Sequence, residues 1–173
     1  MNVRPKLSGI RPKPIRVSQS GLVTIEPLRA TGWSPLVIRP NTQSAARASS
    51  TLSLAEWLGG SLEFVQRKLL VHGAVLFRGF EVDSVERFAE IARAVTPDLL
   101  AYKERSTPRT EIGGHIYTAT EYPADKRIPL HNENSYSHEF PRKVWFCCLQ
   151  PASEGGATPI ADSRQVFREL DSS

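Results

Sequence analysis

The clearest periodic pattern of apolar and polar positions lies between residues 53 and 97. In the segment 53–73 apolar residues recur at helical spacing, which predicts a helix that ends at Gly73. Ser61 is a candidate N-cap in this segment. The apolar face of the predicted helix consists of Leu62, Val65, Leu69 and Leu70.

A second helix is predicted over residues 83–97, after a short and mostly apolar strand at 74–80. Asp83 or Ser84 would cap this helix, and Pro97 would close it. Its apolar face would consist of Val85, Phe88, Ile91, Ala92 and Val95. Helix and strand alternate here as at the start of an α/β unit.

The remaining segments have mostly strand and turn character. Residues 21–28 have short β character, and 29–50 are predicted to be turn and loop around one apolar patch. Beyond residue 98 the segments 111–122 and 127–136 indicate strand and turn, 143–150 a buried strand, and 151–162 a turn entering another strand.

A last helix is predicted over residues 162–170, with Asp162 as its cap and Val166, Phe167 and Leu170 as its apolar face. Helices followed by short antiparallel-type strands favour an α+β protein, specifically a β-sandwich or jelly roll decorated by helices.

Basic residues are concentrated at the N-terminus. The formal net charge is +4, and the first 25 residues contain five basic residues and no acidic one. Nucleic-acid binding normally uses a basic face of the folded domain interleaved with aromatic residues, so this arm is weak support for it. The arm also lacks the apolar region of a secretory signal. We interpret residues 1–50 as an irregular basic leader and loop, with an organelle transit peptide as the alternative, and 51–173 as the domain.

Neither a membrane span nor an oxidising compartment is indicated. The longest apolar run, 144–149, has six residues, whereas a membrane-spanning helix needs about 20. Cys147 and Cys148 are neighbours whose side chains would point to opposite faces of a strand, so a disulfide between them would be strained. Reduced cysteines fit a cytoplasmic protein.

The candidate chemistry lies in the stretch IPLHNENSY, residues 128–136. His131 and Glu133 are two positions apart, so on an extended segment both side chains leave the same face and can converge on one ion. A facial set of two histidines and one carboxylate binds iron(II) in non-haem oxygenases. The alternative is a hydrogen-bonded polar pair at the end of a strand, and these two residues alone leave both interpretations open.

Three stretches in this order and spacing, YTATEYPADKRIPLHNENSY, KVWFCCLQPA and GGATPIADSRQVF, resemble the TauD/TfdA-like family of iron(II)- and 2-oxoglutarate-dependent dioxygenases. The resemblance is to the branch that includes hydroxylases of natural-product biosynthesis. It covers roughly residues 60–173, and the stretch HGAVLFRGF is similar to the strand before the family's core. It implies a double-stranded β-helix (jelly roll) with flanking helices, of which residues 51–173 would form the N-terminal part.

The resemblance also implies roles for individual residues. His131 and Glu133 would be iron(II) ligands, and the hydroxyl of Thr158 would reach a carboxylate of the cosubstrate 2-oxoglutarate. The region that often faces the substrate in this family would contain Tyr117, Thr118 and Glu121. The alternatives are a strand threonine at residue 158 and an ordinary exposed strand edge for the other three.

The family's second histidine ligand, and the arginine that pairs with 2-oxoglutarate, lie farther downstream in the family pattern than residue 173. None of the other three histidines, His72, His115 and His138, matches that position. We expect His72 at a helix end, His115 in a turn or lining a pocket, and His138 beyond the strand end. The expected jelly roll is therefore incomplete in this chain.

The sequence thus predicts an oxygenase that couples oxidative decarboxylation of 2-oxoglutarate to hydroxylation of an unactivated C–H bond. The substrate would be a small molecule or an amino-acid derivative, free or bound to a carrier, and the chain as given is expected to be truncated and inactive. The alternative is a non-catalytic jelly-roll fragment that acts as a binding or interaction module and forms a homo-oligomer through open strand edges. A zinc hydrolase ranks last, because it needs three protein ligands and a general base. No nucleic-acid or membrane partner is expected.

Overall fold

The computed structural model describes residues 21–43, 52–103, 108–119, 123 and 126–171. Of the irregular basic leader and loop predicted for residues 1–50, residues 1–20 and 44–50 lie outside these ranges. The expected division between residues 50 and 51 also lies outside them and stays a prediction.

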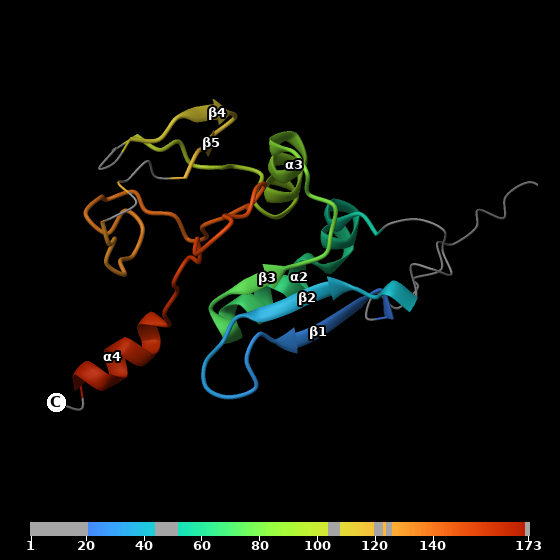
Figure 1. The fold of residues 1–173 in the computed structure, drawn as a ribbon, viewed down its shortest axis with the longest axis horizontal. Helices are drawn as coiled ribbons and strands as arrows, with labels where there is room; N and C mark the ends of the chain where they lie inside the picture. The colour runs from blue at the N-terminus through green and yellow to red at the C-terminus, as the bar shows by residue number, and fades with distance from the viewer. Residues whose placement is uncertain (1–20, 44–51, 104–107, 120–122, 124–125, 172–173) are drawn as a thin grey trace, which may run out of the picture.

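A three-stranded sheet forms the N-terminal part of the described chain (Figure 1). Strand β1 (Val23–Pro27) pairs antiparallel with β2 (Leu36–Pro40), which pairs parallel with β3 (Val75–Phe77). The predicted strand character of 21–28 and 74–80 is confirmed. The prediction of loop over 29–50 is wrong for β2.

The central strand β2 is buried on both faces, since the neighbouring residues Leu36, Val37 and Ile38 are all buried. A strand of this kind carries a continuous apolar run without alternation. Its sequence therefore resembles an isolated apolar patch, which explains why the pattern failed to reveal it.

Helix α2 (Leu54–His72) begins earlier than its predicted cap. The hydroxyl of Ser53 accepts a hydrogen bond from the backbone N–H of Glu56 at 3.4 Å, so Ser53 is the N-cap. The prediction of Ser61 as the cap is wrong, because this residue is buried within the helix. The buried face extends towards the N-terminus through Leu54, Trp57 and Leu58.

Helix α2 ends at its C-cap Gly73, as predicted. Gly73 adopts the left-handed conformation with φ of 74°, and its N–H donates to the carbonyl of Leu69 at 2.8 Å. The indole Nε1 of Trp33 donates to the carbonyl of His72 at 2.9 Å. Leu70, expected on the buried face, is instead 77% exposed.

Helix α3 (Val85–Val95) confirms the second predicted helix. Of the two candidate caps, Ser84 is the N-cap, and its hydroxyl accepts from the backbone N–H of Arg87 at 3.2 Å. Ile91 and Val95 of α3 are buried.

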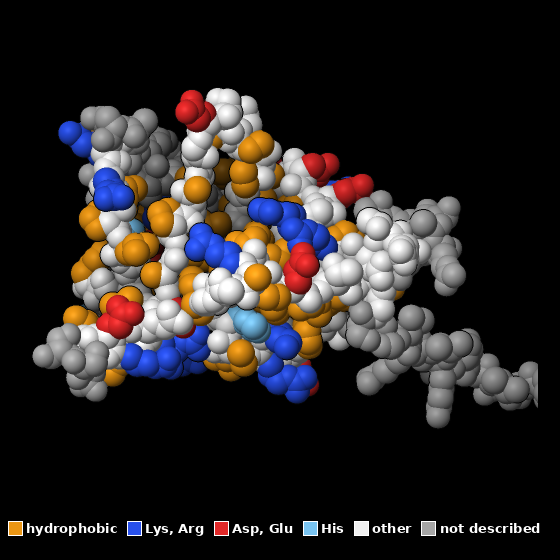
Figure 2. All heavy atoms as spheres, turned by 60° about the horizontal axis from the view of Figure 1, so that its bottom comes forward, with side chains coloured by type: hydrophobic (Ala, Val, Ile, Leu, Met, Phe, Trp, Pro, Cys, Tyr) orange, Lys and Arg blue, Asp and Glu red, His pale blue; other side chains and the backbone are white. Residues whose placement is uncertain are grey.

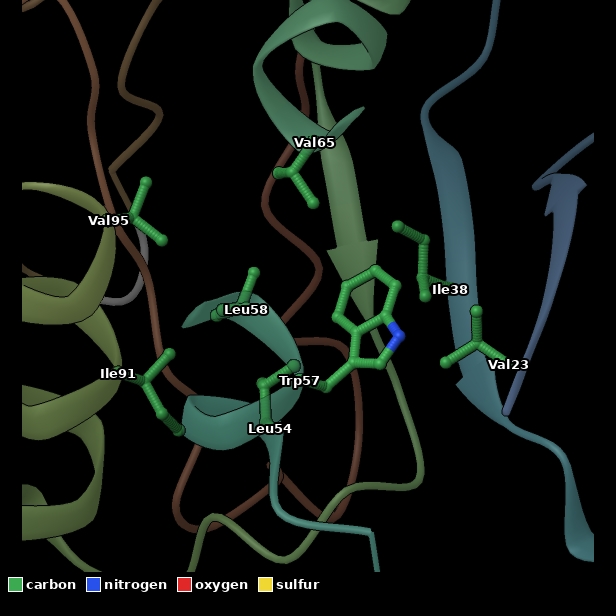
Figure 3. Close-up of a cluster of buried hydrophobic side chains, with 8 residues drawn as sticks. All are labelled: Val23, Ile38, Leu54, Trp57, Leu58, Val65, Ile91 and Val95. Carbon is green, nitrogen blue, oxygen red and sulfur yellow. The ribbon is translucent and has the colours of Figure 1, made fainter. Parts of the chain in front are cut away.

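The hydrophobic core joins the sheet to both helices (Figure 3). Trp57 points from α2 towards β2, and its ring meets that of Phe77 on β3 edge-on, with centroids 6.4 Å apart. The buried members of this core are Val23, Ile38, Leu54, Trp57, Leu58, Val65, Ile91 and Val95.

A small hairpin follows α3. Strand β4 (Glu111–Gly113) pairs antiparallel with β5 (Ile116–Tyr117), with Gly114 and His115 at positive φ between them. The Nη2 group of Arg93 on α3 donates to the carbonyl of Gly114 at 3.1 Å, which attaches the hairpin to the helix. The predicted strand and turn over 111–122 are confirmed as far as residue 119, and 120–122 lie outside the described residues.

The predicted buried strand at 143–150 is wrong. This segment has alternating exposure but no strand partner in the described part of the chain. Trp145 packs against the core, whereas Phe146 is 72% exposed. Aromatic and apolar content favours a strand, but a strand forms only where a second segment completes its hydrogen bonds. The short strand expected within 151–162 is absent from the described structure for the same reason.

Helix α4 (Ser163–Asp171) confirms the last predicted helix, but its apolar face is not buried. Val166, Phe167 and Leu170 are exposed. On the face drawn in Figure 2, hydrophobic side chains lie open to solvent between charged ones. In the described residues the chain is a mixed α+β protein with two small sheets and no barrel-like sheet. No described helix has the length and apolar character needed to cross a bilayer.

Truncation of Leu58 to alanine is expected to lower the free energy of unfolding by about 3 kcal/mol, because it removes a fully buried side chain from the core. Leu70→Ala on the same helix is the matched control. It should change the free energy by less than about 0.5 kcal/mol, since Leu70 is exposed. Urea denaturation followed by circular dichroism measures both, and equal losses would contradict this description of the core.

Candidate metal centre

The two candidate ligands lie at a turn and not on a paired strand. Residues 127–132 are irregular, and 133–136 form a turn in which Asn134 has φ of 53°. Asparagine tolerates this left-handed conformation. The carbonyl of Asn134 accepts from the N–H of Ser137 at 3.0 Å. The strand expected within 127–136 is therefore wrong, and the turn is confirmed.

One hydrogen bond fixes the imidazole of His131. Its Nδ1 lies 2.8 Å from the carbonyl oxygen of Pro129. A carbonyl only accepts, so Nδ1 carries the proton and donates, and in the neutral ring Nε2 keeps a lone pair. This is the usual arrangement of a metal-binding histidine, whose second nitrogen is held by a carbonyl or carboxylate.

The carboxylate of Glu133 approaches the same nitrogen. Its Oε2 lies 3.8 Å from His131 Nε2, so the two side chains lie on the same side of the backbone. Its other oxygen, Oε1, accepts a hydrogen bond from Nη2 of Arg109 at 3.2 Å. Glu133 is thus held by one oxygen and presents the other to His131.

These donors fit a divalent cation. With a neutral ring, a lone pair and a negatively charged oxygen face each other, an arrangement that a positive charge between them would stabilise. Bonds from a first-row metal to nitrogen and oxygen are about 2.0–2.2 Å long, so two of them can span the observed 3.8 Å. With a protonated ring the same pair would be a partly exposed ion pair of small energy. Within the described residues no three His, Cys, Asp or Glu side chains gather around a common point.

The two cysteines are free thiols, in agreement with the expectation of reduced residues. Burial raises the pKa of the Cys147 thiol, and the neighbouring Cys148 raises that pKa further. Metals bind the thiolate, so this shift disfavours Cys147 as a ligand at neutral pH.

The predicted cosubstrate residue, Thr158, is exposed in the irregular segment between residue 150 and α4. Among the described hydrogen bonds none joins it to His131 or Glu133, and its role stays a prediction. In the same segment Gly155 and Gly156 have φ of 69° and 70°, a left-handed conformation that favours glycine.

Two of the predicted substrate residues have structural partners. The hydroxyl of Tyr117 accepts from the backbone N–H of Tyr102 at 3.0 Å. The hydroxyl of Thr118 accepts from the N–H of Thr110 at 2.9 Å and so extends the hairpin. Glu121 lies outside the described residues. Contact of any of the three with a substrate stays a prediction.

Comparison with known proteins identifies the family. The model of the taurine catabolism dioxygenase TauD, TfdA family matches residues 38–173. The chain belongs to the TauD/TfdA family. The match begins within β2, earlier than the sequence resemblance at about residue 60 indicated.

Two relatives of this TauD/TfdA chain are each 36% identical to it. One is the dapdiamide synthesis protein DdaC of Enterobacter agglomerans, matched over 76% of this chain and 40% of its own length. The other is a clavaminate synthase-like protein of Arabidopsis thaliana, matched over 79% of this chain and 42% of its own length. The chain therefore spans about two-fifths of the length of the relatives that it matches.

The other histidines of this TauD/TfdA chain lie elsewhere. His72 is the last residue of α2, as predicted. His115 sits in the hairpin turn, where Nδ1 is 3.6 Å from Glu111, and His138 is exposed beyond the 133–136 turn. None of them joins His131 and Glu133 in a group of three within the described part of the chain.

Sequence reasoning missed Arg109, which contacts Glu133. The two residues are 24 positions apart. No local spacing rule connects residues at such a distance. A search for a basic partner of the carboxylate would have found several arginines in the sequence and no reason to choose this one.

The turn is also attached to α4. The amide oxygen of Asn132, between the two candidate ligands, accepts from the hydroxyl of Ser163 at 3.2 Å. The next residue, Arg164, donates to the carbonyls of Leu70 and Val71 at the end of α2, at 2.8 and 3.2 Å. Arg164 therefore fastens α4, and through it the turn, to the core helix.

Asp162 supports this attachment, because Arg164 Nε donates to its Oδ1 at 2.8 Å. Hydrogen bonding to Arg164 lowers the pKa of the Asp162 carboxyl from its ordinary value of 3.8. A lowered folded-state pKa means that the ion pair is complete above this ordinary value. The pair is lost only as the pH falls through the lowered pKa.

Arg164→Ala is expected to release α4 and to accelerate chymotryptic cleavage after Phe167 by about tenfold, because local opening then costs less. Arg168→Ala, a basic residue of the same helix, is the control and should leave the cleavage rate unchanged. Limited proteolysis at pH 7 measures the rates. Equal rates for the parent and Arg164→Ala would show that this contact does not hold the helix.

Proposed function

We propose that the chain is part of an iron(II)- and 2-oxoglutarate-dependent oxygenase that hydroxylates an unactivated C–H bond. The observation that carries the proposal is the approach of His131 Nε2 to Glu133 Oε2, 3.8 Å apart, in a chain of the TauD/TfdA family. When bound, iron(II) with 2-oxoglutarate would supply the activation of O₂ and the oxidative decarboxylation that drive the hydroxylation.

The residues of this chain would hold the metal ion and orient the cosubstrate. His131 would offer Nε2 as the ligand atom, because Nδ1 donates its hydrogen to the Pro129 carbonyl and so cannot bind a metal itself. Glu133 supplies a negative charge that stabilises a dication. The proposed role of Thr158 is to donate its hydroxyl hydrogen to a carboxylate of 2-oxoglutarate.

We further propose that the described elements belong to a jelly roll. The exposure pattern of 143–149, with Trp145 directed to the core and Phe146 to solvent, is that of a strand that awaits partners. In the family pattern the third metal ligand and the arginine that binds 2-oxoglutarate come after residue 173. Catalysis is therefore proposed for a protein that supplies them.

The names of the relatives support a small-molecule substrate. One relative is named for the synthesis of dapdiamide, and the other is named for its likeness to clavaminate synthase. A small molecule or amino-acid derivative, free or carrier-bound, is the substrate class that we propose. We place the reaction in the cytoplasm, on the basis of the reduced cysteines.

The second candidate is a non-catalytic binding module or homo-oligomer. It is favoured by the exposed apolar side chains of Phe146, Phe167 and Leu170, which are 69–72% accessible. This candidate predicts self-association in size-exclusion chromatography and no specific uptake of iron.

The deciding experiment is anaerobic titration of the purified chain with iron(II), read by equilibrium dialysis. The chain is expected to take up iron weakly, and His131→Ala and Glu133→Gln should each weaken binding by about tenfold or more. His138→Ala, which removes an exposed histidine outside the pair, is the control and should bind like the parent.

A relative that carries the downstream part then tests the cosubstrate. Addition of iron(II) and 2-oxoglutarate without oxygen should produce a weak visible charge-transfer band, which is lost in the variants equivalent to His131→Ala and Glu133→Gln. If no band forms in that longer protein, the oxygenase assignment is wrong.

A further inference from the structure

We propose that Arg109 is a positioning residue for Glu133: it holds one carboxylate oxygen so that the other is presented to the metal. This inference rests on the proposed metal centre and deepens it. Arg109 Nη2 donates to Glu133 Oε1 at 3.2 Å, while Oε2 is the oxygen that faces His131.

The pair is unusually shielded for this protein. The side chains of Arg109 and Glu133 are 22% and 21% exposed. By contrast, the helix-surface pair of Arg67 and Glu63 is 68% and 84% exposed. Exposed pairs are screened and contribute little, whereas a shielded pair fixes the orientation of its members more strongly.

Arg109 is itself held by an aromatic pair. Its guanidinium carbon lies 4.9 Å from the centre of the Tyr102 ring. That ring packs against Tyr117 with centroids 5.9 Å apart, and the Tyr117 hydroxyl accepts from the Tyr102 backbone. Tyr117 belongs to β5, so Glu133 is connected through Arg109 and Tyr102 to the hairpin.

The contact uses one oxygen of the carboxylate. Arginine often binds a carboxylate with two parallel hydrogen bonds, one to each oxygen. Here Nε of Arg109 is buried and has no hydrogen-bond partner within the described residues. A two-oxygen contact would engage Oε2 and close the side that faces His131. The observed contact leaves that oxygen free for a single bond to a metal ion.

Two effects on metal affinity oppose each other. The positive charge of Arg109 offsets part of the negative charge that attracts a cation, but the hydrogen bond removes the rotational freedom of the carboxylate. Residues that support metal ligands in this way typically strengthen binding by about 10–100-fold. The shielding of the pair and the stacking on Tyr102 favour the second effect.

Lysine cannot replace Arg109 in this role. A lysine ammonium can also lie over an aromatic ring, as Lys68 does over Phe64. Its compact head on a flexible stem lacks the planar fork that lets Arg109 contact Tyr102 and donate to Glu133 in one fixed geometry. Arg109→Lys keeps the charge and loses the geometry, while Arg109→Met loses both. The two variants therefore separate charge from position.

The test is titration of the full chain and its variants with Co(II) alone, followed by dialysis and by the visible spectrum of the bound ion. We expect Arg109→Met to bind about tenfold more weakly or worse and Arg109→Lys to lose most of the same affinity. The d–d bands of bound Co(II) should change in both, because the carboxylate is no longer fixed. Arg67→Met, in the exposed pair, is the matched control and should retain the parent's affinity and spectrum.

The outcomes are distinct. Parent-like affinity and spectrum in Arg109→Met, with binding lost in Glu133→Gln, would overturn the positioning role and leave the metal centre intact. Tighter Co(II) binding in Arg109→Met would show that the repulsion between the Arg109 charge and the cation outweighs the fixing of the carboxylate. That result would also overturn the positioning role. No Co(II) uptake by the parent chain would overturn the metal centre and this inference together. If Arg109→Met does not fold by circular dichroism, Tyr102→Leu removes the supporting ring, and parent-like binding in that variant would contradict the proposal.

Discussion

The packing of α2 on the central strand β2 is the contact on which the other described elements depend. Ile38 and Leu58 are fully buried in one core with Trp57 between helix and sheet. This contact holds the N-terminal part of α2, where Trp57 and Leu58 lie, while Trp33 binds the carbonyl of His72 at its other end. Helix α3 packs on the same core through Ile91 and Val95, so both helices have defined positions before any part of the candidate site is considered.

The turn that carries His131 and Glu133 is tied to this framework from two directions. On one side α3 holds the hairpin through Arg93 and Gly114, and the hairpin reaches Glu133 through the stacked Tyr102 and Arg109. On the other side α2 holds Arg164 of α4, and Ser163 reaches Asn132. The turn has no strand partner among the described residues. Side-chain contacts to distant segments therefore hold the turn in position, in place of the backbone hydrogen bonds of a sheet.

The sequence predicted those elements whose physical cause is local. Helices α2 and α3 follow from apolar periodicity. The end of α2 follows from Gly73, because glycine readily adopts the left-handed conformation found there. Side chains at residues 131 and 133 share a side, as their spacing predicted, although the backbone there is a turn. The predicted cap of α2 was wrong, because both Ser53 and Ser61 precede apolar residues. Only Ser53 has a glutamate three positions later, Glu56, whose backbone N–H donates to the Ser53 hydroxyl.

The failures have non-local causes. Strand β2 forms because it pairs with β1 and with β3, which follows β2 only after helix α2. The segment 143–150 has no such partner strand in the described structure. The Arg109–Glu133 contact joins positions that only the folded chain brings together. Thr158, whose proposed partner is a small molecule, has no hydrogen bond to His131 or Glu133 among the described residues, so the fold gives no sign of its role.

The hydrogen bond between Asn132 and Ser163 joins positions 31 residues apart. The intervening segment, residues 133–162, starts and ends next to the turn, and Trp145 within it packs against the core. Because closing a longer loop costs little extra entropy, residues can be added to or removed from its exposed part between the 133–136 turn and residue 143 without displacing the two ends. Natural variation in length is therefore best tolerated there, and this part of the segment offers a region where new recognition surfaces can evolve around an unchanged pair of ligands.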